Sequence, residues 1–299
     1  MYSATEHLAR TLWLGKFLWS NRMAFYSAYF DESGVRQPEI GCILVVSGWI
    51  ASVTQWEQFE FDWKLFLAKY DVPYLHMNEY AHSVGPFKKW EGKGKEGTRR
   101  NFIGDAAEII RNTIQAGFAC GVSEQVFDQT DSVYELRSKF PNPYALAGRS
   151  CASLAVEWQK KSNRGLSQEI RYVFEDGEQG KGGLFHAMTE VIPAMPSPIF
   201  EPGRDQKPSE KWPDGRKGLV QLQAADFLAY EWGKFGSDGR ELMRGTRQIR
   251  NSMNALPANK VRRIFLTSRH LALFCQGLNI PKRTMLNSSH ANAKGKAAQ

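Results

Sequence analysis

The segment AFYSAYFDESG, residues 24–34, decides how the rest of the chain is interpreted. Its residues 25–30 are apolar on both faces and rich in aromatic side chains, which is typical of a central strand. Asp31 ends this apolar run, and the Ser-Gly pair that follows indicates a turn. A second apolar run, Cys42–Ala51, comes after a short polar loop. The two runs therefore predict a β-hairpin at the start of the fold.

Beyond the hairpin, helical and extended patterns are mixed along the chain. Thr54 and Glu57 stand in the positions of a capping box at the start of a helix over residues 54–70. The predicted apolar face of this helix consists of Phe59, Trp63, Phe66 and Leu67. A Gly- and Lys-rich loop over 85–97 is expected to be mobile, and a long proline-rich stretch over 193–218 is expected to be irregular. Further strands are expected at 117–122, 170–174 and 219–222, and further helices at 99–114, 144–160, 184–191, through 232, from 240 and near 268–275. This mixture predicts an α/β fold with a mixed β-sheet flanked by helices.

The composition is that of a folded protein with one large core. The chain has 299 residues, of which 42% are hydrophobic. Four scattered cysteines without a Cys-x-x-Cys spacing argue against a zinc site and favour a cytoplasmic location. No apolar run reaches the ~18 residues of a membrane span, so no membrane association is expected. Residues 1–22 are expected to form an N-terminal extension, 23–280 the folded domain and 281–299 a polar tail.

Basic residues are concentrated in the last fifth of the chain. The net charge is +8, but residues 234–299 hold 13 Lys and Arg and only two acids. Such asymmetry points to an acidic partner, with nucleic acid first. In a predicted basic helix, Arg240, Arg244 and Arg247 share one face, and Arg262 and Arg263 follow. We expect these arginines to contact a phosphate backbone, although a solvated surface is the simpler alternative.

Three acidic motifs stand where a buried strand or helix should be apolar. Asp31 follows the first strand, and Glu175-Asp176 follows the strand over 170–174. Asp226 is surrounded by alanine, leucine and phenylalanine in a helix that is apolar nearly all round. Carboxylates in such settings are costly unless something pairs with them. If they converge, Mg²⁺ or Mn²⁺ is the expected partner, and phosphoryl transfer is the chemistry these metals most often serve.

Each motif also has a structural interpretation. Asp31 and Glu175-Asp176 are followed by glycine-containing turns, and the alternative for Asp226 is a position on a solvated stripe of its helix. Adjacent strand residues point to opposite faces, so only one of Glu175 and Asp176 is expected to face a site. His76 and Glu79 lie three residues apart. Glu79 is the better candidate ligand, because hard cations prefer oxygen to nitrogen.

Four motifs together resemble the domain of unknown function 3800 family, which is grouped with the ribonuclease H-like superfamily. They are DESG at 31–34, HMNE at 76–79, FEDG at 174–177 and QLQAAD at 221–226, and the resemblance spans residues 25–232. It implies a ribonuclease H-like mixed sheet with acids at Asp31, at Glu175 or Asp176, and at Asp226. It further implies two Mg²⁺ or Mn²⁺ ions on these carboxylates and cleavage of phosphodiesters.

The sequence thus predicts a metal-dependent nuclease that hydrolyses phosphodiester bonds by a two-metal-ion mechanism. Asp31, Glu175 or Asp176, and Asp226 would hold the metals, and Glu79 would complete the site or position water. The alternative is a non-catalytic nucleic-acid-binding or protein-binding module that retains the fold, with its acids paired to arginines or backbone donors. DNA and RNA, endo- and exonuclease action, and the identity of any protein partner are left open at this stage.

Overall fold

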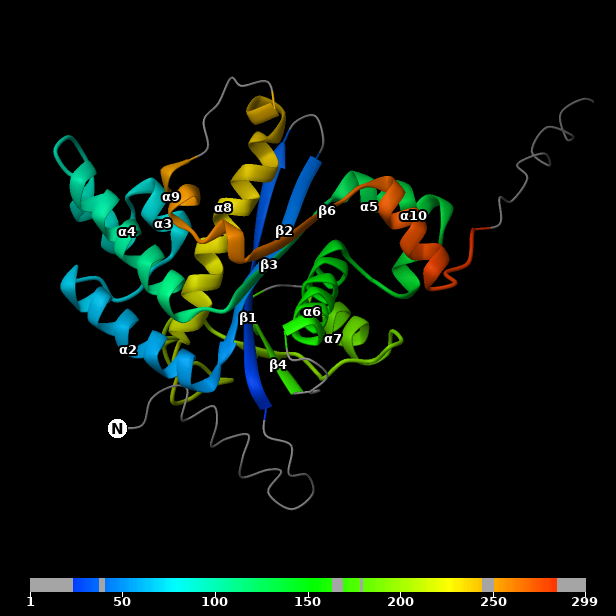
Figure 1. Ribbon diagram of the computed structural model, residues 1–299, viewed down its shortest axis with the longest axis horizontal. Coiled ribbons are helices and arrows are strands. Elements are labelled where there is room, and N and C mark those ends of the chain that lie inside the picture. Colours follow the sequence, from blue (N-terminus) through cyan, green and yellow to red (C-terminus); the bar gives the residue numbers. More distant parts are fainter. Residues whose placement is uncertain (1–23, 38–40, 163–168, 178–179, 244–249, 284–299) are drawn as a thin grey trace, which may run out of the picture.

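The core of the molecule is a six-stranded mixed β-sheet in the order β5-β4-β1-β2-β3-β6. The computed structural model describes residues 24–37, 41–162, 169–177, 180–243 and 250–283. Strands β1, β4 and β5 run parallel to one another, β2 is antiparallel to both β1 and β3, and β6 is parallel to β3. The expected α/β class with a mixed sheet flanked by helices is confirmed (Figure 1).

The predicted hairpin is formed by β1 (Ala24–Gln37) and β2 (Gly41–Ser52). It is longer than expected, because β1 continues past Asp31, which pairs with Ser47. The parallel pairing of β1 with β4 (Glu169–Glu175) stops earlier, at Phe30 opposite Phe174. Asp31 therefore does not end the strand, but it does stand one residue beyond the end of the parallel ladder.

Two strands were not predicted. The strand β5 has only three residues, Ile199–Glu201, within a segment whose prolines suggested irregular structure. The strand β6, Val261–Leu266, carries two arginines and pairs with β3, Ala116–Ser123. Both occupy edges of the sheet, where short strands and charged side chains are common.

Helices cover both faces of the sheet (Figure 1). On one face α8 (Val220–Met243) packs against β1 and β2, and α2 (Val53–Lys69) packs outside it together with α4 (Glu96–Thr113). The same side holds α3 (Met77–His82), the 3₁₀ helix η1 (Gly85–Trp90) and α9 (Asn251–Ala255). The opposite side holds α5 (Glu124–Val133), α6 (Pro143–Ser162), α7 (Lys181–Thr189) and α10 (Ser268–Gly277). Each face has its own apolar cluster.

The start of α2 differs from the sequence prediction. Ser52, not Thr54, caps the helix, and Gln55, not Glu57, returns a side-chain hydrogen bond to the cap. The predicted apolar face is confirmed, since all four of its residues are buried: Phe59, Trp63, Phe66 and Leu67. The hydrophobic pattern therefore predicted the buried face of α2 correctly, whereas the capping residue lies two positions earlier than predicted.

The expected strand over 219–222, apart from Leu219, and the helix expected through 232 form one continuous helix, α8, which ends at Met243. The helix expected from 240 is described only as far as Met243, and its remaining residues lie outside the described ranges. A short apolar run is ambiguous between strand and helix until its packing is known. Here the run lies against the sheet, and Trp49 of β2 donates its indole N–H to the carbonyl of Ala224 at 2.9 Å. Gly236 lets the later part of α8 approach β6, because an added Cβ would lie 2.8 Å from the ring of Phe265.

The loop expected to be mobile over 85–97 is partly structured. Residues Gly85–Trp90 form the 3₁₀ helix η1, in which Phe87 and Trp90 are buried. Both rings contact Phe102 of α4, with centroid distances of 5.7 and 4.9 Å. Aromatic burial thus holds a segment whose glycines and lysines had suggested mobility.

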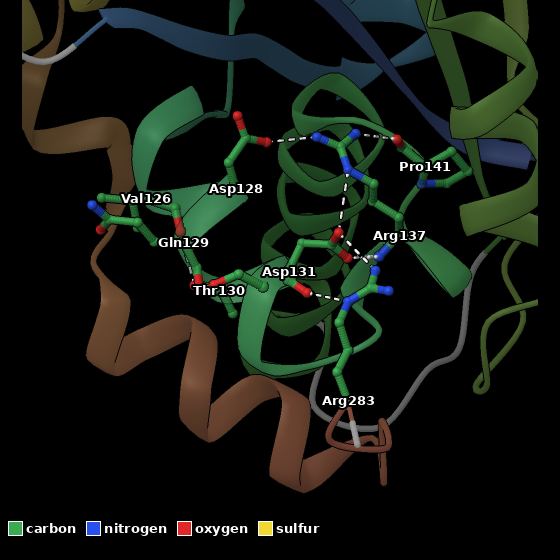
Figure 2. Close-up of polar contacts among 9 residues, drawn as sticks. Val126, Asp128, Gln129, Thr130, Asp131, Arg137, Pro141 and Arg283 are labelled. Carbon is green, nitrogen blue, oxygen red and sulfur yellow. Dashed lines mark hydrogen bonds and ion pairs between the residues drawn. The ribbon is translucent and has the colours of Figure 1, made fainter. Parts of the chain in front are cut away.

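The last described residues are attached to α5 (Figure 2). The guanidinium of Arg283 donates to the carboxylate of Asp131 at 2.8 Å, and its backbone N–H donates to the carbonyl of Val133 at 2.9 Å. Arg137 binds the same carboxylate and that of Asp128. Residues 281–283, which were assigned to the polar tail, therefore pack on the fold. The expected extension over 1–22 and the rest of the tail, 284–299, lie outside the described residues.

Candidate metal centre

The structure brings together three of the predicted acids from distant parts of the chain. Asp31 lies on β1, Glu175 is the last residue of β4, and Asp226 lies on α8. The last residues paired between the parallel strands β1 and β4 are Phe30 and Phe174. Asp31 and Glu175 each follow one of these residues, so they lie side by side. The charges of Glu175 and Asp226 both act on the carboxyl group of Asp31.

Strand alternation explains why these side chains face α8. Tyr29 and Val173 belong to the apolar cluster on the α8 side of the sheet, whereas Phe30 and Phe174 belong to the other. Residues two apart on a strand point to the same face. Asp31 and Glu175 therefore follow Tyr29 and Val173 towards α8.

The carboxyl groups of Asp31 and Asp226 are held in an environment that disfavours their ionised forms. Asp31 is only 6% exposed. Burial raises its pKa well above the usual range, and the charges of Glu175, Glu32 and Asp226 raise it further. Burial also raises the pKa of Asp226 to about 7, although the hydrogen bond from the Met77 backbone opposes this and lowers it.

Asp176 does not join this cluster. Its carboxylate is paired with Lys181 of α7 and with Arg216. Burial by itself raises the pKa of Asp176, but the hydrogen bonds from Lys181 and Arg216 outweigh this effect, and the net pKa lies below its usual value. The sequence left open which of these two adjacent acids faces the site. In the structure Glu175 lies in the cluster with Asp31 and Asp226, whereas Asp176 belongs to a separate ion-pair network.

Glu79 lies at the edge of the site, on α3. Its carboxylate accepts hydrogen bonds from Tyr74 Oη at 2.9 Å and from Arg204 Nη1 at 2.8 Å, and His76 Nδ1 lies 3.3 Å from its Oε1. Burial raises the pKa of Glu79, but the donors outweigh it and the net pKa is lowered. Gly85 allows this close packing. It has φ +57°, and a Cβ there would lie 2.5 Å from Glu79 Oε2.

Gln223 holds the surrounding segments in place. The side chain is buried, and its Oε1 accepts from Trp63 Nε1 at 2.9 Å and from the Leu75 backbone at 3.0 Å. Its Nε2 donates to the carbonyl of Gly203 at 3.0 Å. Gln223 thereby connects α8 to α2, to the segment before α3 and to the segment after β5.

The sequence interpretation did not assign Tyr74, Gly203, Arg204 or Gln223 to the site. Gly203 donates its backbone N–H to Glu175 Oε1 at 3.3 Å. Gly203 and Arg204 lie in the proline-rich stretch that showed no regular pattern. Among these residues, only Gln223 could be expected near the site from the sequence, because it lies one helical turn before Asp226 on the same face of the helix.

A small cavity opens beside the acids. It has a volume of about 40 Å³, and the side chains that line it include Tyr74, His76, Glu175, Arg204, Gln223 and Asp226. A cavity needs roughly 10–15 Å³ to hold one water molecule, so there is room for a few waters or a partly hydrated cation. The side chains of the wall carry carboxylate, imidazole, amide and guanidinium groups, which can bind water or an ion.

As the side chains stand, the described residues contain no group of three His, Cys, Asp or Glu side chains arranged to hold a metal ion. Asp31 accepts a hydrogen bond from the backbone N–H of Glu32, Glu175 accepts from that of Gly203, and Asp226 accepts from that of Met77. The chemistry of the donors nevertheless fits Mg²⁺ or Mn²⁺, which prefer carboxylate oxygens. The raised pKa values of Asp31 and Asp226 indicate charges that a cation would counter.

Of the arginines predicted to bind phosphate, the two whose side chains are described, Arg262 and Arg263, are not brought to the acid cluster. Arg262 and Arg263 lie on β6, not on a basic helix, because that segment completes the sheet edge beside β3. β6 is three strands from β1, or ~14 Å at the usual strand spacing. Arg263 packs over Trp232 at 4.7 Å. Arg240 lies in α8 but its side chain is not described, and Arg244 and Arg247 lie outside the described residues.

Across the described ranges, every helix is too short or too polar to cross a membrane. When the chain is compared with known proteins, no protein-family model and no curated protein sequence matches it.

Proposed function

We propose that this protein is an Mg²⁺- or Mn²⁺-dependent nuclease with a ribonuclease H-like fold. The observation that carries the proposal is the meeting of Asp31, Glu175 and Asp226, which come from β1, β4 and α8. Buried like charges are costly, and a protein gains nothing structural from assembling three of them. A divalent cation is the partner that makes such a cluster favourable.

The topology supports the proposal. β1, β2 and β3 form an antiparallel meander, and β4 and β5 continue the sheet on the other side of β1, parallel to it. This is the arrangement expected of a ribonuclease H-like sheet. The resemblance to the domain of unknown function 3800 family implied one acid on the first strand, one on a later strand and one on a helix. Asp31, Glu175 and Asp226 occupy these positions.

Each acidic residue has a role under this proposal. Asp31, Glu175 and Asp226 would hold the metal ions, which supply an activated water and stabilise the charge that develops on the phosphate. Glu79, kept ionised by Tyr74 and Arg204, would orient water at the edge of the cavity. Asp176 would have no direct part, because Lys181 and Arg216 already occupy its carboxylate.

Cleavage of labelled oligonucleotides tests the proposal directly. Single-stranded and duplex DNA and RNA would be incubated with the protein in Mg²⁺, in Mn²⁺ and in EDTA. We expect metal-dependent cleavage of at least one substrate, lost in Asp31→Asn and Asp226→Asn and retained in Glu57→Gln, which changes an exposed acid on α2. Cleavage that persists in EDTA or in Asp226→Asn would exclude this site as its source.

A non-catalytic binding module is the second candidate. It is favoured by the lack, among the described residues, of three side chains already arranged around a metal. In that case the stability of the protein would not respond to Mn²⁺. Metal binding therefore separates the two candidates.

A further inference from the structure

A structured hairpin projects from the segment that joins β5 to α8. Gln206 and Arg216 pair in antiparallel fashion, with backbone hydrogen bonds of 2.8 and 3.1 Å. Towards its tip, the N–H of Trp212 donates to the carbonyl of Ser209 at 3.1 Å, and that of Gly215 donates to the carbonyl of Trp212 at 2.9 Å. We call residues 206–216 the 206–216 hairpin.

The base of this hairpin is attached to the acid cluster. Gly203, three residues before it, bonds Glu175 and Gln223. Arg216, its last residue, binds the carboxylates of Asp176 and Glu201. These contacts fix the hairpin to the edge of the sheet that holds the candidate metal ligands.

The tip of the hairpin exposes an aromatic ring beside cations. Trp212 is 43% exposed. The guanidinium of Arg216 lies 4.9 Å from its ring centre, and the ammonium of Lys211 lies 5.7 Å away. An exposed tryptophan flanked by basic side chains is the arrangement that proteins use to stack on unpaired bases while attracting the phosphate backbone.

Arg204, two residues before the 206–216 hairpin, lies at the cavity. It lines the cavity with Glu175 and Asp226, and its side chain is 50% exposed. The guanidinium lies 5.5 Å from the ring centre of Tyr74 and donates to Glu79, which orients it at the cavity mouth. An arginine in this position can bind a phosphate oxygen by a charge-assisted hydrogen bond.

We propose that the substrate is single-stranded nucleic acid, that Trp212 stacks on one of its bases and that Arg204 binds an adjacent phosphate. This inference rests on the proposed nuclease function and adds the substrate class. In a duplex the base faces are already covered by their neighbours, so an exposed ring such as Trp212 gains a stacking partner only from an unpaired strand.

Binding of fluorescein-labelled 20-nucleotide single strands and matching duplexes in EDTA tests this inference without cleavage. We expect wild type to prefer the single strand. Stacking is worth about 1–3 kcal/mol per base, so Trp212→Ala should weaken single-strand binding about 5- to 150-fold. Trp212→Phe should retain most of the affinity. Phe61→Ala, which removes an aromatic ring that is 61% exposed on α2, should leave it unchanged.

Arg204→Ala should reduce the dependence of log affinity on log salt by about 0.7, the contribution of one phosphate contact on a single strand. Lys217→Ala, on the same segment and paired with Asp205, is the matched control. Equal single-strand affinities of wild type and Trp212→Ala, with circular dichroism showing both folded, would overturn the inference, as would a preference of wild type for duplex. Trp212-dependent binding without any cleavage in metal would instead reject the nuclease proposal alone.

Discussion

The backbone N–H of Met77 donates a 2.6 Å hydrogen bond to Oδ2 of Asp226. Met77 is the first residue of α3, whereas Asp226 lies on α8, 149 positions later in the chain. This bond satisfies one carboxylate oxygen inside an otherwise apolar stretch of helix. It also holds α3, and with it Glu79, against the cavity.

The stability of the metal-free protein should fall as pH rises, because Asp226 is protonated more readily in the folded state. The pKa of Asp226 is raised from 3.8 to about 7. Its stabilising contribution to the free energy of unfolding is therefore fully present below about pH 4 and is lost as pH rises through about 7. Asp31 acts in the same direction. In EDTA, Asp226→Asn should be more stable than wild type at pH 8 by on the order of 2–4 kcal/mol, and the two should converge near pH 4.

Urea unfolding between pH 4 and pH 8 measures this difference. Glu57→Gln, which changes an exposed acid, should follow wild type throughout. If wild type and Asp226→Asn kept the same stability difference at every pH, Asp226 would not carry a raised pKa.

Mn²⁺ should stabilise wild type, and the neighbouring residues Glu175 and Asp176 should differ in this response. A ligand that binds only the folded state stabilises it by about 2.7 kcal/mol at a hundredfold excess over its dissociation constant. Glu175→Gln should abolish the rise in Tm. Asp176→Asn should lower the starting Tm, because the largely buried Arg216 loses one of its two carboxylate partners, but should keep the response.

Thermal unfolding with and without millimolar Mn²⁺ measures the shift in Tm. The enthalpy of Mn²⁺ binding, measured in a series of buffers, provides a second test. Because protons must leave Asp31 and Asp226 for the metal to bind, the binding enthalpy near pH 6.5 should vary with the ionisation enthalpy of the buffer. An unchanged Tm in wild type would favour the non-catalytic module.

Replacing Gln223 by Leu should destabilise the protein although the volume hardly changes. The substitution leaves Trp63 Nε1, the Leu75 N–H and the Gly203 carbonyl without their shared partner. Each buried polar group left unpaired costs about 1–3 kcal/mol, and water from the adjacent cavity recovers part of this, so we expect a loss of about 2–4 kcal/mol. Urea unfolding measures it. Gln58→Leu on the exposed face of α2 should change stability by less than about 0.5 kcal/mol, and a similarly small effect at Gln223 would contradict the scaffolding role.

The C-terminal arginines should contribute to nucleic-acid binding through salt-dependent backbone contacts. If Arg240, Arg244 and Arg247 each bind a phosphate, the triple substitution to alanine should reduce the slope of log affinity against log salt by roughly two to three. Arg262→Ala, on β6, should reduce it by about 0.7–0.9. Sequence preference and the Mn²⁺ response should not change, since these residues contact neither bases nor metal. If wild type and the arginine variants show equal slopes of log affinity against log salt, these arginines do not contact phosphates and are only solvated.

The sequence alone determined most of the regular structure and the identity of the unusual acids. Apolar runs located β1, β2, β3 and β4, because a strand buried on both faces must be apolar along its length. The periodicity of residues 54–70 located the buried face of α2. Asp31 and Asp226 could be singled out because a carboxylate inside an apolar segment needs a compensating partner somewhere in the fold.

Tertiary structure decided which acids meet. Glu175 and Asp176 are adjacent and chemically similar, and their order on the chain does not say which face α8 covers. Once α8 lies on the face of Tyr29 and Val173, alternation directs Glu175 to Asp31, while Arg216, 40 positions away, pairs with Asp176. Likewise the run at 219–222 became the start of α8 only through packing, and Gly203 and Arg204 reached the cavity only because β5 adds to the sheet edge. Long-range contacts set these outcomes, and local sequence does not encode them.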